Sequence, residues 1–358
     1  MKLLISAGGT GGHIFPGIAV AEAFAAKEGK NNVVFVGTTY GLENKIIPRY
    51  GFRLLFADAR QFLGKSIVYK MATLIRLIHG IHTCMGLIKK ERPDVILGMG
   101  GFTSVPVVLA GFFLGVPVFL HEQNAEPGLA NKMLSKIAKC TFTSFEESKQ
   151  YLKGGKVYHT GNPVRKMLKT SQGSKTDDTF CIFVFGGSRG ARSINEAILT
   201  LLPYMESYKN STMYHQTGSE DYERILEAYK KTGIKYEVFP FTDNMGKYYE
   251  LSDVVISRAG ASTIFELAYF KKAAILIPYP FSAGQHQWKN AYHVESIGGG
   301  YVIGNDEATG ERLHEVIKHL MNERVLLKKM GENLGKLYVD DAEERIISKI
   351  KEEVGTKH

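Results

Sequence analysis

Short apolar runs alternate with helical patterns along the whole chain, and each run has the length and composition of a buried strand. Strands that alternate with helices at this spacing form right-handed βαβ units. The pattern therefore predicts an α/β fold built from doubly wound parallel sheets. The predicted strands of the first half lie near residues 2–6, 33–36, 95–97, 116–120, 140–143 and 157–159. Those of the second half lie near residues 180–185, 212–215, 236–239, 253–256, 274–277 and 301–303.

A glycine-rich turn follows the first predicted strand of each half. The first turn reads GGTGG at residues 8–12, and the second reads GGSRGA at residues 186–191. Because the chain restarts the same strand-turn-helix opening about halfway along, we expect two Rossmann-like domains. The first covers residues 1–164 and the second covers residues 165–341, and a helix within residues 342–358 can pack back on the first domain.

The longest uncharged stretch, residues 95–120, is 26 residues long and would cross a bilayer if it were one helix. Five glycines and two prolines interrupt it. We interpret it as a buried strand, a glycine loop, a helix over residues 103–114 and a second buried strand. Continuous apolar strands of this kind are typical of parallel sheets that are covered on both faces. A membrane span is the disfavoured alternative.

Charge is distributed unevenly along the 358 residues. Residues 1–164 contain 19 Lys and Arg against 10 Asp and Glu, whereas residues 165–358 contain 26 of each. The net charge of +9 therefore belongs to the first half, which predicts an anionic partner there. Nucleic acid is not expected, because basic and aromatic residues are not interleaved as in nucleic-acid binding modules. The cysteines Cys84, Cys140 and Cys181 are far apart, which favours a reducing compartment without disulfides or a zinc site.

The two glycine turns are suited to bind anions. Neither is a nicotinamide fingerprint, because Ile14 stands where the third glycine of that motif would be, and neither is a Walker loop. Both place bare backbone N–H groups at a helix N-terminus, where the helix dipole favours a phosphate. The alternative is a tight turn that only lets helix and strand pack closely. Two matching turns favour the phosphate interpretation.

Further polar residues follow the predicted strands of the second half. Ser188, Arg258, Glu266 and Gln287 all lie shortly after strands, and the carboxyl ends of parallel strands are where open α/β sheets bind ligands. An arginine suits a diphosphate, and a carboxylate accepts hydrogen bonds from a ribose diol. The structural alternatives are a surface arginine for Arg258, a solvated helix residue for Glu266 and a helix cap for Gln287.

Taken together, these motifs resemble the family of glycosyltransferases that form the peptidoglycan precursor lipid II. Its members transfer N-acetylglucosamine from UDP-N-acetylglucosamine to undecaprenyl-diphosphate-linked N-acetylmuramoyl-pentapeptide. The resemblance implies a GT-B architecture, in which two Rossmann-like domains face each other across an interdomain cleft, and it implies no cofactor. The matching motifs lie at residues 8–16, 98–102, 121–124, 161–165, 186–191 and 258–263.

The resemblance also implies roles for single residues. Ser188 and Arg165 would meet the diphosphate, and Thr242 would offer its backbone to uracil. Glu266 would bind the ribose, and Gln287 would bind the transferred sugar. The full set of implied substrate-binding residues is Thr10, Gly11, Gly12, Asn124, Arg165, Ser188, Thr242, Arg258, Ala261, Ser262, Thr263, Ile264, Phe265, Glu266 and Gln287.

The family inverts the anomeric centre in one displacement, so an acceptor hydroxyl must lose its proton as UDP leaves. No Asp-x-Asp motif is present to hold a metal, and helix N-termini with arginine are expected to stabilise the leaving diphosphate instead. His13 is the hypothesised general base, because imidazole suits this task near neutral pH. Glu122 is the alternative base, and an idle helix-cap role is the alternative for His13.

Residues 59–90 contain six Lys or Arg and no Asp or Glu, with apolar residues at helical spacing. Such a basic amphipathic segment can lie on an anionic leaflet without spanning it. A core helix with a solvated polar face is the alternative. The charge asymmetry and the lipid-linked acceptor favour peripheral binding, through the first domain, at the cytoplasmic face of the cell membrane.

Two other functions fit the nucleotide motifs. One is a related enzyme on the same fold, either a UDP-sugar epimerase or a glycosyltransferase that acts on diacylglycerol. The other is a non-enzymatic sensor of UDP-sugars, which needs no base on the acceptor side. Activity on the polyprenyl acceptor distinguishes the lipid II-forming enzyme from both.

Overall fold

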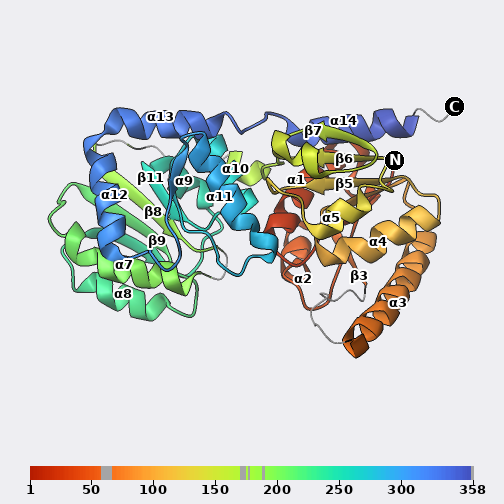
Figure 1. Ribbon diagram of the computed structural model, residues 1–358, viewed down its shortest axis with the longest axis horizontal. Coiled ribbons are helices and arrows are strands. Elements are labelled where there is room, and N and C mark those ends of the chain that lie inside the picture. The colour runs from red at the N-terminus through yellow and green to blue at the C-terminus, as the bar shows by residue number, and fades with distance from the viewer. Residues whose placement is uncertain (58–66, 170–174, 176–177, 188–189, 356–358) are drawn as a thin grey trace. The chain divides into compact units, whose positions relative to one another are not determined.

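The computed structural model describes residues 1–57, 67–169, 175, 178–187 and 190–355. The chain forms two compact units, which are Met1–Lys166 with Val339–His358 and Met167–Tyr338 (Figure 1). Each unit is a parallel sheet with helices on both faces, so the predicted α/β fold with two Rossmann-like domains is confirmed. The boundary between the first unit and the second lies between Lys166 and Met167, whereas the sequence predicts it between residues 164 and 165.

The sheet of the first unit has the strand order β3-β2-β1-β4-β5-β6-β7, and its pairings are parallel. Its central strands are buried on both faces, which explains their continuous apolar sequences. The edge strand β3 was not predicted, because its residues are only partly buried and lack that pattern. The strands are β1 (Leu3–Ser6), β2 (Val33–Gly37), β3 (Arg53–Phe56), β4 (Val95–Gly98), β5 (Val118–Glu122), β6 (Cys140–Thr143) and β7 (Lys156–His159).

Two apolar cores cover the two faces of this sheet. One core joins α1 to the C-terminal helix α14 through Ile346, Ile347 and Ile350, and the other joins α3 to α4. Residues 95–120 form β4, α4 and β5, as interpreted from the sequence, and none of the helices described is long and apolar enough to cross a membrane. The helices are α1 (Gly11–Glu28), α2 (Glu43–Ile46), α3 (Ile67–Glu91), α4 (Gly101–Phe113), α5 (Leu129–Leu134) and α14 (Ala342–Gly355), with short 3-10 helices at Lys30–Asn32, Ile47–Tyr50 and Glu146–Tyr151.

The sheet of the second unit has the strand order β10-β9-β8-β11-β12-β13, again with parallel pairings. Its strands are β8 (Phe180–Phe185), β9 (Ser211–Gln216), β10 (Lys235–Phe239), β11 (Val254–Ser257), β12 (Ala273–Leu276) and β13 (Gly300–Val302). Its helices are α7 (Arg192–Met205), α8 (Tyr222–Lys230), α9 (Met245–Leu251), α10 (Ala261–Phe270), α11 (His286–Ser296), α12 (Gly310–Asn322) and α13 (Arg324–Gly335), after α6 (Lys166–Lys169) and with a 3-10 turn at Ala283–Gln285.

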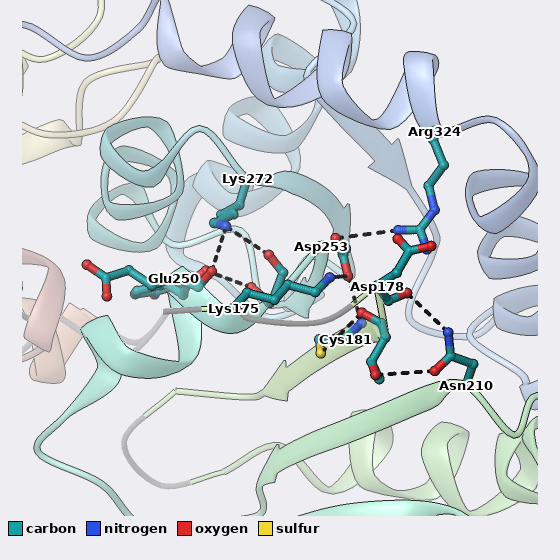
Figure 2. A network of polar contacts seen from close by, with 11 residues as sticks. Lys175, Asp178, Cys181, Asn210, Glu250, Asp253, Lys272 and Arg324 are labelled. Carbon is teal, nitrogen blue, oxygen red and sulfur yellow. Dashed lines mark hydrogen bonds and ion pairs between the residues drawn. The ribbon is translucent and has the colours of Figure 1, made fainter. Parts of the chain in front are cut away.

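A polar network closes the amino-terminal edge of this second sheet (Figure 2). Asp253, just before β11, accepts a hydrogen bond from the backbone N–H of Cys181 at 2.8 Å and pairs with Lys175 and Arg324. Lys272 donates to the carbonyl oxygens of Glu250 and Ser252 at the end of α9, and burial lowers its pKa. These charged groups bind one another and backbone groups, and in this way they join the starts of strands to helices. We therefore assign this edge a structural role.

His215 in β9 makes the stability of the second unit depend on pH. The side chain is fully buried, with Asn195 and Tyr229 at hydrogen-bonding distance from its ring. Desolvation lowers the pKa of His215 to about 3. Because the unfolded chain takes up a proton near pH 6.5 and the folded chain does not, the free energy of unfolding should fall as the pH drops from about 6.5 towards 4, by up to about 1.4 kcal/mol per pH unit.

The fluorescence of Trp288, the only tryptophan in the sequence, reports urea unfolding of this unit because Trp288 lies in α11. His215→Gln removes the titrating group, so its free energy of unfolding should depend less steeply on pH over that range than that of the wild type. Equal pH dependence in the two proteins would contradict the assignment.

Candidate active site

The first glycine turn joins β1 to α1 at the carboxyl edge of its sheet. Gly9 adopts a positive φ of 87°, and Thr10 precedes the helix in an extended conformation without a side-chain cap. The N–H of Gly9 donates to Oε2 of Glu43 at 3.0 Å, so a carboxylate of the chain itself occupies this donor. Thr10 is exposed, and Gly11 and Gly12 are half-buried at the start of α1. The N–H of Gly9 is therefore already used within the chain, and Thr10 is the exposed residue of the turn.

His13 lies in the first turn of α1 and is half-buried. Its Nδ1 lies 3.2 Å from the carbonyl oxygen of Gly8 and 3.5 Å from Oγ1 of Thr10. A carbonyl oxygen only accepts hydrogen bonds, so we assign the ring proton to Nδ1 and the lone pair to Nε2. The ring packs on the turn after β4, where a Cβ atom on Gly101 would come within 3.1 Å of Cε1.

Glu122 ends β5 and is buried, with 2% of its surface exposed. Its Oε1 accepts from the backbone and side-chain N–H groups of Asn124, each at 2.9 Å. Its Oε2 accepts from the N–H of Gly128 at 3.1 Å and from Nδ2 of Asn131 at 2.8 Å. Both oxygens therefore organise the loop that follows β5, and the side chain of half-buried Asn124 is part of the same arrangement.

His121 and Gln123 lie on either side of Glu122 in sequence and join neighbouring segments. Nε2 of Gln123 contacts Nδ1 of His121 at 2.9 Å and donates to the carbonyl oxygen of Met99 at 3.0 Å. Nε2 of His121 lies 3.3 Å from the carbonyl oxygen of Gly161. Desolvation lowers the pKa of His121 to about 4, and the neighbouring His13 contributes to that shift. His121 is therefore neutral near physiological pH.

Arg165 belongs to the first unit, whereas the sequence analysis placed it at the start of the second domain. Its guanidinium lies 3.9 Å from the ring centroid of Phe15, a cation–π contact in α1. The side chain is half-buried, and the contact places a positive charge two residues along α1 from His13.

In the second unit, the glycine turn joins β8 to α7, and Ser188 and Arg189 lie outside the described residues. Arg258 follows β11. Its Nη1 donates to the carbonyl oxygens of Ile277 and Pro278 at 2.9 and 3.2 Å, and its Nη2 donates to Oγ of Ser193 in α7 at 2.6 Å. Desolvation lowers the pKa of Arg258 to about 10, so the guanidinium stays charged at neutral pH. Arg258 thus holds two loops of the carboxyl edge and adds positive charge there.

The next predicted residues lie on α10, which begins after Gly260 without a side-chain cap. Ser262 and Thr263 are half-buried at its first turn, whereas Glu266 is 8% exposed and accepts a hydrogen bond from Oη of Tyr249 at 2.8 Å. The side chains of Ala261, Ile264 and Phe265 are buried in the core, so these three residues can offer a ligand only their backbone.

Gln287 and Thr242 lie in the two remaining loops of this edge. Oε1 of Gln287 accepts from the N–H of Tyr279 at 2.9 Å, which closes the loop after β12 beside the carbonyl groups bound by Arg258. Oγ1 of Thr242 accepts from the N–H of Asn244 at 3.0 Å, in the loop between β10 and α9. In the described ranges, no group of three or more His, Cys, Asp or Glu residues is arranged to hold a metal ion.

The first unit's polar cluster also contains Glu43, Gln123 and Asn131, which were not predicted as site residues from the sequence. Gln123 was inside a quoted motif, but its neighbours gave no sign of the hydrogen bond to Met99. Glu43 stands in the short helix α2, and its partner Gly9 is distant in the sequence. Only the sheet brings the two residues together.

Comparisons with known proteins agree with this geometry. The model of the glycosyltransferase family 28 N-terminal domain matches residues 3–143, and that of the family 28 C-terminal domain matches residues 181–346. The UDP-N-acetylglucosamine–N-acetylmuramyl-(pentapeptide) pyrophosphoryl-undecaprenol N-acetylglucosamine transferase of Geotalea daltonii is 41% identical over 355 residues, which cover 98% of this chain and 97% of the relative. The transferase of the same name from Myxococcus xanthus is 38% identical over 340 residues, 94% of this chain and 89% of the relative.

Solved structures place the fold in the same group. The crystal structure of Acinetobacter baumannii MurG aligns with a TM-score of 0.79 and 27% identity, over 98% of this chain and 100% of the other. The UDP-GlcNAc 2-epimerase of Neisseria meningitidis, at 15% identity and a TM-score of 0.70 over 98% of this chain and 100% of the other, shares the fold alone. The family models and the curated relatives thus cover both units of the chain, which belongs to glycosyltransferase family 28 and, within it, to the family of lipid II-forming N-acetylglucosamine transferases.

Proposed function

We propose that this chain transfers N-acetylglucosamine from UDP-N-acetylglucosamine to undecaprenyl-diphosphate-linked N-acetylmuramoyl-pentapeptide, with His13 as the general base. The substrates follow from the transferases that are about 40% identical over nearly the whole chain. The role of His13 rests on one observation, the contact of Nδ1 with the carbonyl oxygen of Gly8. With the proton on Nδ1, Nε2 is the nitrogen that can accept one.

The reaction is a single displacement that inverts the anomeric carbon. The acceptor hydroxyl oxygen bonds to that carbon, and the bond from the carbon to the diphosphate oxygen of UDP breaks. The hydroxyl proton passes to Nε2 of His13, and UDP leaves with its negative charge. General-base assistance of this kind is typically worth about 10²–10⁴-fold in rate.

The geometry favours His13 over Glu122 as the base. Each carboxylate oxygen of Glu122 already accepts hydrogen bonds from the loop it organises, at 2.8–3.1 Å. These hydrogen bonds commit both oxygens to the loop rather than to a substrate hydroxyl. Protonation of Glu122 would also disturb Asn124 and Asn131, which depend on it. We therefore assign Glu122 the task of shaping the loop after β5.

The donor nucleotide is assigned to the second unit. The first-turn N–H groups of α10, at Ala261 to Thr263, and the charge of Arg258 are suited to its diphosphate. Glu266, oriented by Tyr249, would accept from the ribose, and Gln287 and Thr242 lie in loops of the same sheet edge. Ser188, in the glycine turn, is assigned to the nucleotide by resemblance.

In the first unit, we assign Thr10, Gly11 and Gly12 to the diphosphate of the acceptor. Asn124 and Arg165 are assigned to substrate binding because they belong to the motifs that carry the family resemblance.

We assign α3 the contact with the cytoplasmic face of the cell membrane. Ile75 and Ile78 are 65% and 59% exposed, next to the exposed Arg76, and the exposed Lys89 and Lys90 stand in the last turn of the same helix. Apolar side chains and basic groups on one helix support binding to an anionic leaflet. The earlier part of the segment, residues 59–66, lies outside the described residues.

Glu266→Ala should weaken UDP binding, because it removes a charge-assisted hydrogen bond to the ribose worth roughly 1.5–3 kcal/mol. Titration calorimetry with UDP measures the change. Tyr249→Phe should weaken binding less, since the carboxylate stays and only its orienting hydroxyl is lost. Glu332→Ala, on the exposed face of α13, is the matched control. Unchanged UDP affinity in folded Glu266→Ala would remove Glu266 from the nucleotide site.

His13→Ala should lower the turnover number at least about a hundredfold, since it removes the general base. UDP affinity should stay nearly intact, because His13 belongs to the first unit. Transfer from labelled UDP-N-acetylglucosamine to a short-chain lipid I analogue measures turnover, and His319→Ala, an exposed histidine of α12, is the control. Near-normal turnover in His13→Ala would contradict the role of His13 and leave Glu122 as the candidate base.

Replacement of Ile75 and Ile78 by Ser should weaken sedimentation with phosphatidylglycerol vesicles, because it removes exposed apolar side chains from α3. Binding of the wild type should fall with salt and with the fraction of anionic lipid. Val325→Ser removes an apolar side chain that is 83% exposed on α13 of the second unit, and it should leave binding unchanged. Equal wild-type binding to neutral vesicles would contradict the assignment.

A further inference from the structure

We infer that Glu43 is a positioning residue for His13 and acts through the peptide group that joins Gly8 to Gly9. The inference rests on the proposed role of His13 as the base. The N–H of Gly9 donates to Oε2 of Glu43 at 3.0 Å, and the carbonyl oxygen of Gly8 lies 3.2 Å from Nδ1 of His13. That N–H and that carbonyl are the two ends of one amide. A single peptide group therefore connects the carboxylate to the imidazole.

The carboxylate is held firmly in this position. Glu43 is fully buried, and its Oε1 accepts from the N–H and the hydroxyl of Thr38 at 2.8 and 2.6 Å. The neighbouring glycines leave room for the Glu43 side chain because they have no Cβ atom. A Cβ atom added to Gly8 would lie 2.8 Å from Oε1 of Glu43, and one added to Gly41 would lie 2.1 Å from Oε2. These bonds are donated to Glu43 by N–H and O–H groups, which is the arrangement of an ionised carboxylate.

A negative charge at one end of a hydrogen-bonded chain strengthens the bond at the other end. The carboxylate draws the amide hydrogen of Gly9 and makes the carbonyl oxygen of Gly8 a stronger acceptor. That oxygen fixes the proton on Nδ1 of His13 and stabilises the imidazolium formed when Nε2 takes up the acceptor's proton. The proton on Nδ1 stays in place throughout. Carboxylates behind catalytic histidines in hydrolases have this task through a direct bond, and here one peptide group lies between.

The other titratable groups on elements that pack near His13 do not share this connection in the described structure. His121, at the end of β5, is neutral near physiological pH because desolvation lowers its pKa to about 4. Glu122 directs both oxygens to the Asn124–Asn131 loop. Arg165, stacked on Phe15 in α1, is a cation and supplies no carboxylate. Glu43 is therefore the carboxylate that the Gly8–Gly9 peptide group connects to His13.

Glu43→Gln tests the inference. An amide has one accepting oxygen, so the glutamine cannot accept from both Gly9 and Thr38 as the carboxylate does. We expect the turnover number to fall about tenfold or more, within the range of general-base effects. The KM for UDP-N-acetylglucosamine should stay within about twofold, since binding of the donor is unaffected.

The pH profile supplies a readout that a merely structural role would not move. The charge of Glu43 stabilises the imidazolium and so raises the pKa of His13, and its removal lowers that pKa. In Glu43→Gln the acidic limb of the turnover profile should therefore move to lower pH by about half a unit or more, while the plateau falls. An acidic limb at the wild-type pH would overturn the inference.

Glu91→Gln is the matched control. Glu91 is also a buried carboxylate of the first unit, but it pairs with Lys2 and Arg53 and touches none of the residues assigned to the reaction. Loss of its charge should lower the free energy of unfolding and leave the acidic limb in place. The inference is supported if both variants lose stability but the acidic limb of the turnover profile shifts in Glu43→Gln alone.

A double variant separates this inference from the proposed function. If Glu43 acts through His13, adding Glu43→Gln to His13→Ala should cause no further loss of turnover. Multiplied losses would overturn the role of Glu43 while keeping His13 as the base. Near-normal turnover in His13→Ala alone would instead overturn the proposed base.

The wild-type protein gives an independent measurement that does not require Glu43→Gln to fold. In ¹⁵N spectra of imidazole-labelled protein, the His13 signal is identified by its absence in His13→Ala. Above its pKa, neutral His13 should carry its proton on Nδ1, with that proton shifted downfield by a strong hydrogen bond. A neutral ring with its proton on Nε2 would contradict the inference even if Glu43→Gln fails to fold.

Discussion

Parallel pairing of β1 with β2 and β4 decides where the chemistry of the first unit lies. Ser6 at the end of β1 is in register with Val36 of β2 and with Gly98 of β4. The loops that follow the three strands therefore leave the sheet at one level. One loop leads into α1 and His13, one carries Thr38 and leads to Glu43, and one carries the glycines on which the His13 ring packs. A shift of register would separate all three.

The two glycine turns look alike in sequence but differ in how their backbone donors are used. In the first turn, the N–H of Gly9 donates to a carboxylate of the same chain. In the second unit, positive charge is brought to the sheet edge by Arg258, which is itself fixed by carbonyl groups of the loop after β12. The first turn thus contains an internal hydrogen bond to a carboxylate, whereas the edge of the second sheet carries the positive charge of Arg258.

Much of the architecture could be predicted from the sequence, because buried parallel strands are continuous apolar runs that stand out from their surroundings. The strand β3 could not, since an edge strand with exposed residues such as Arg53 and Phe56 lacks that signal. Residues just after strands, such as His13, Glu122 and Arg258, were also predictable, because the carboxyl edge is known once the strands are known. Glu43 was not, because nothing near it in the sequence marks its bond to Gly9, and that bond exists only once β1 and β2 have paired.

The return of α14 to the first unit makes the second unit an insertion within the chain. The first unit consists of Met1–Lys166 and Val339–His358, and Ile346, Ile347 and Ile350 of the later segment belong to the core that contains Phe24 of α1. A fragment that ended at Lys166 would leave that apolar surface of α1 in water. Ribosomal synthesis passes through such an intermediate, so the first unit is complete only after the whole second unit has been made.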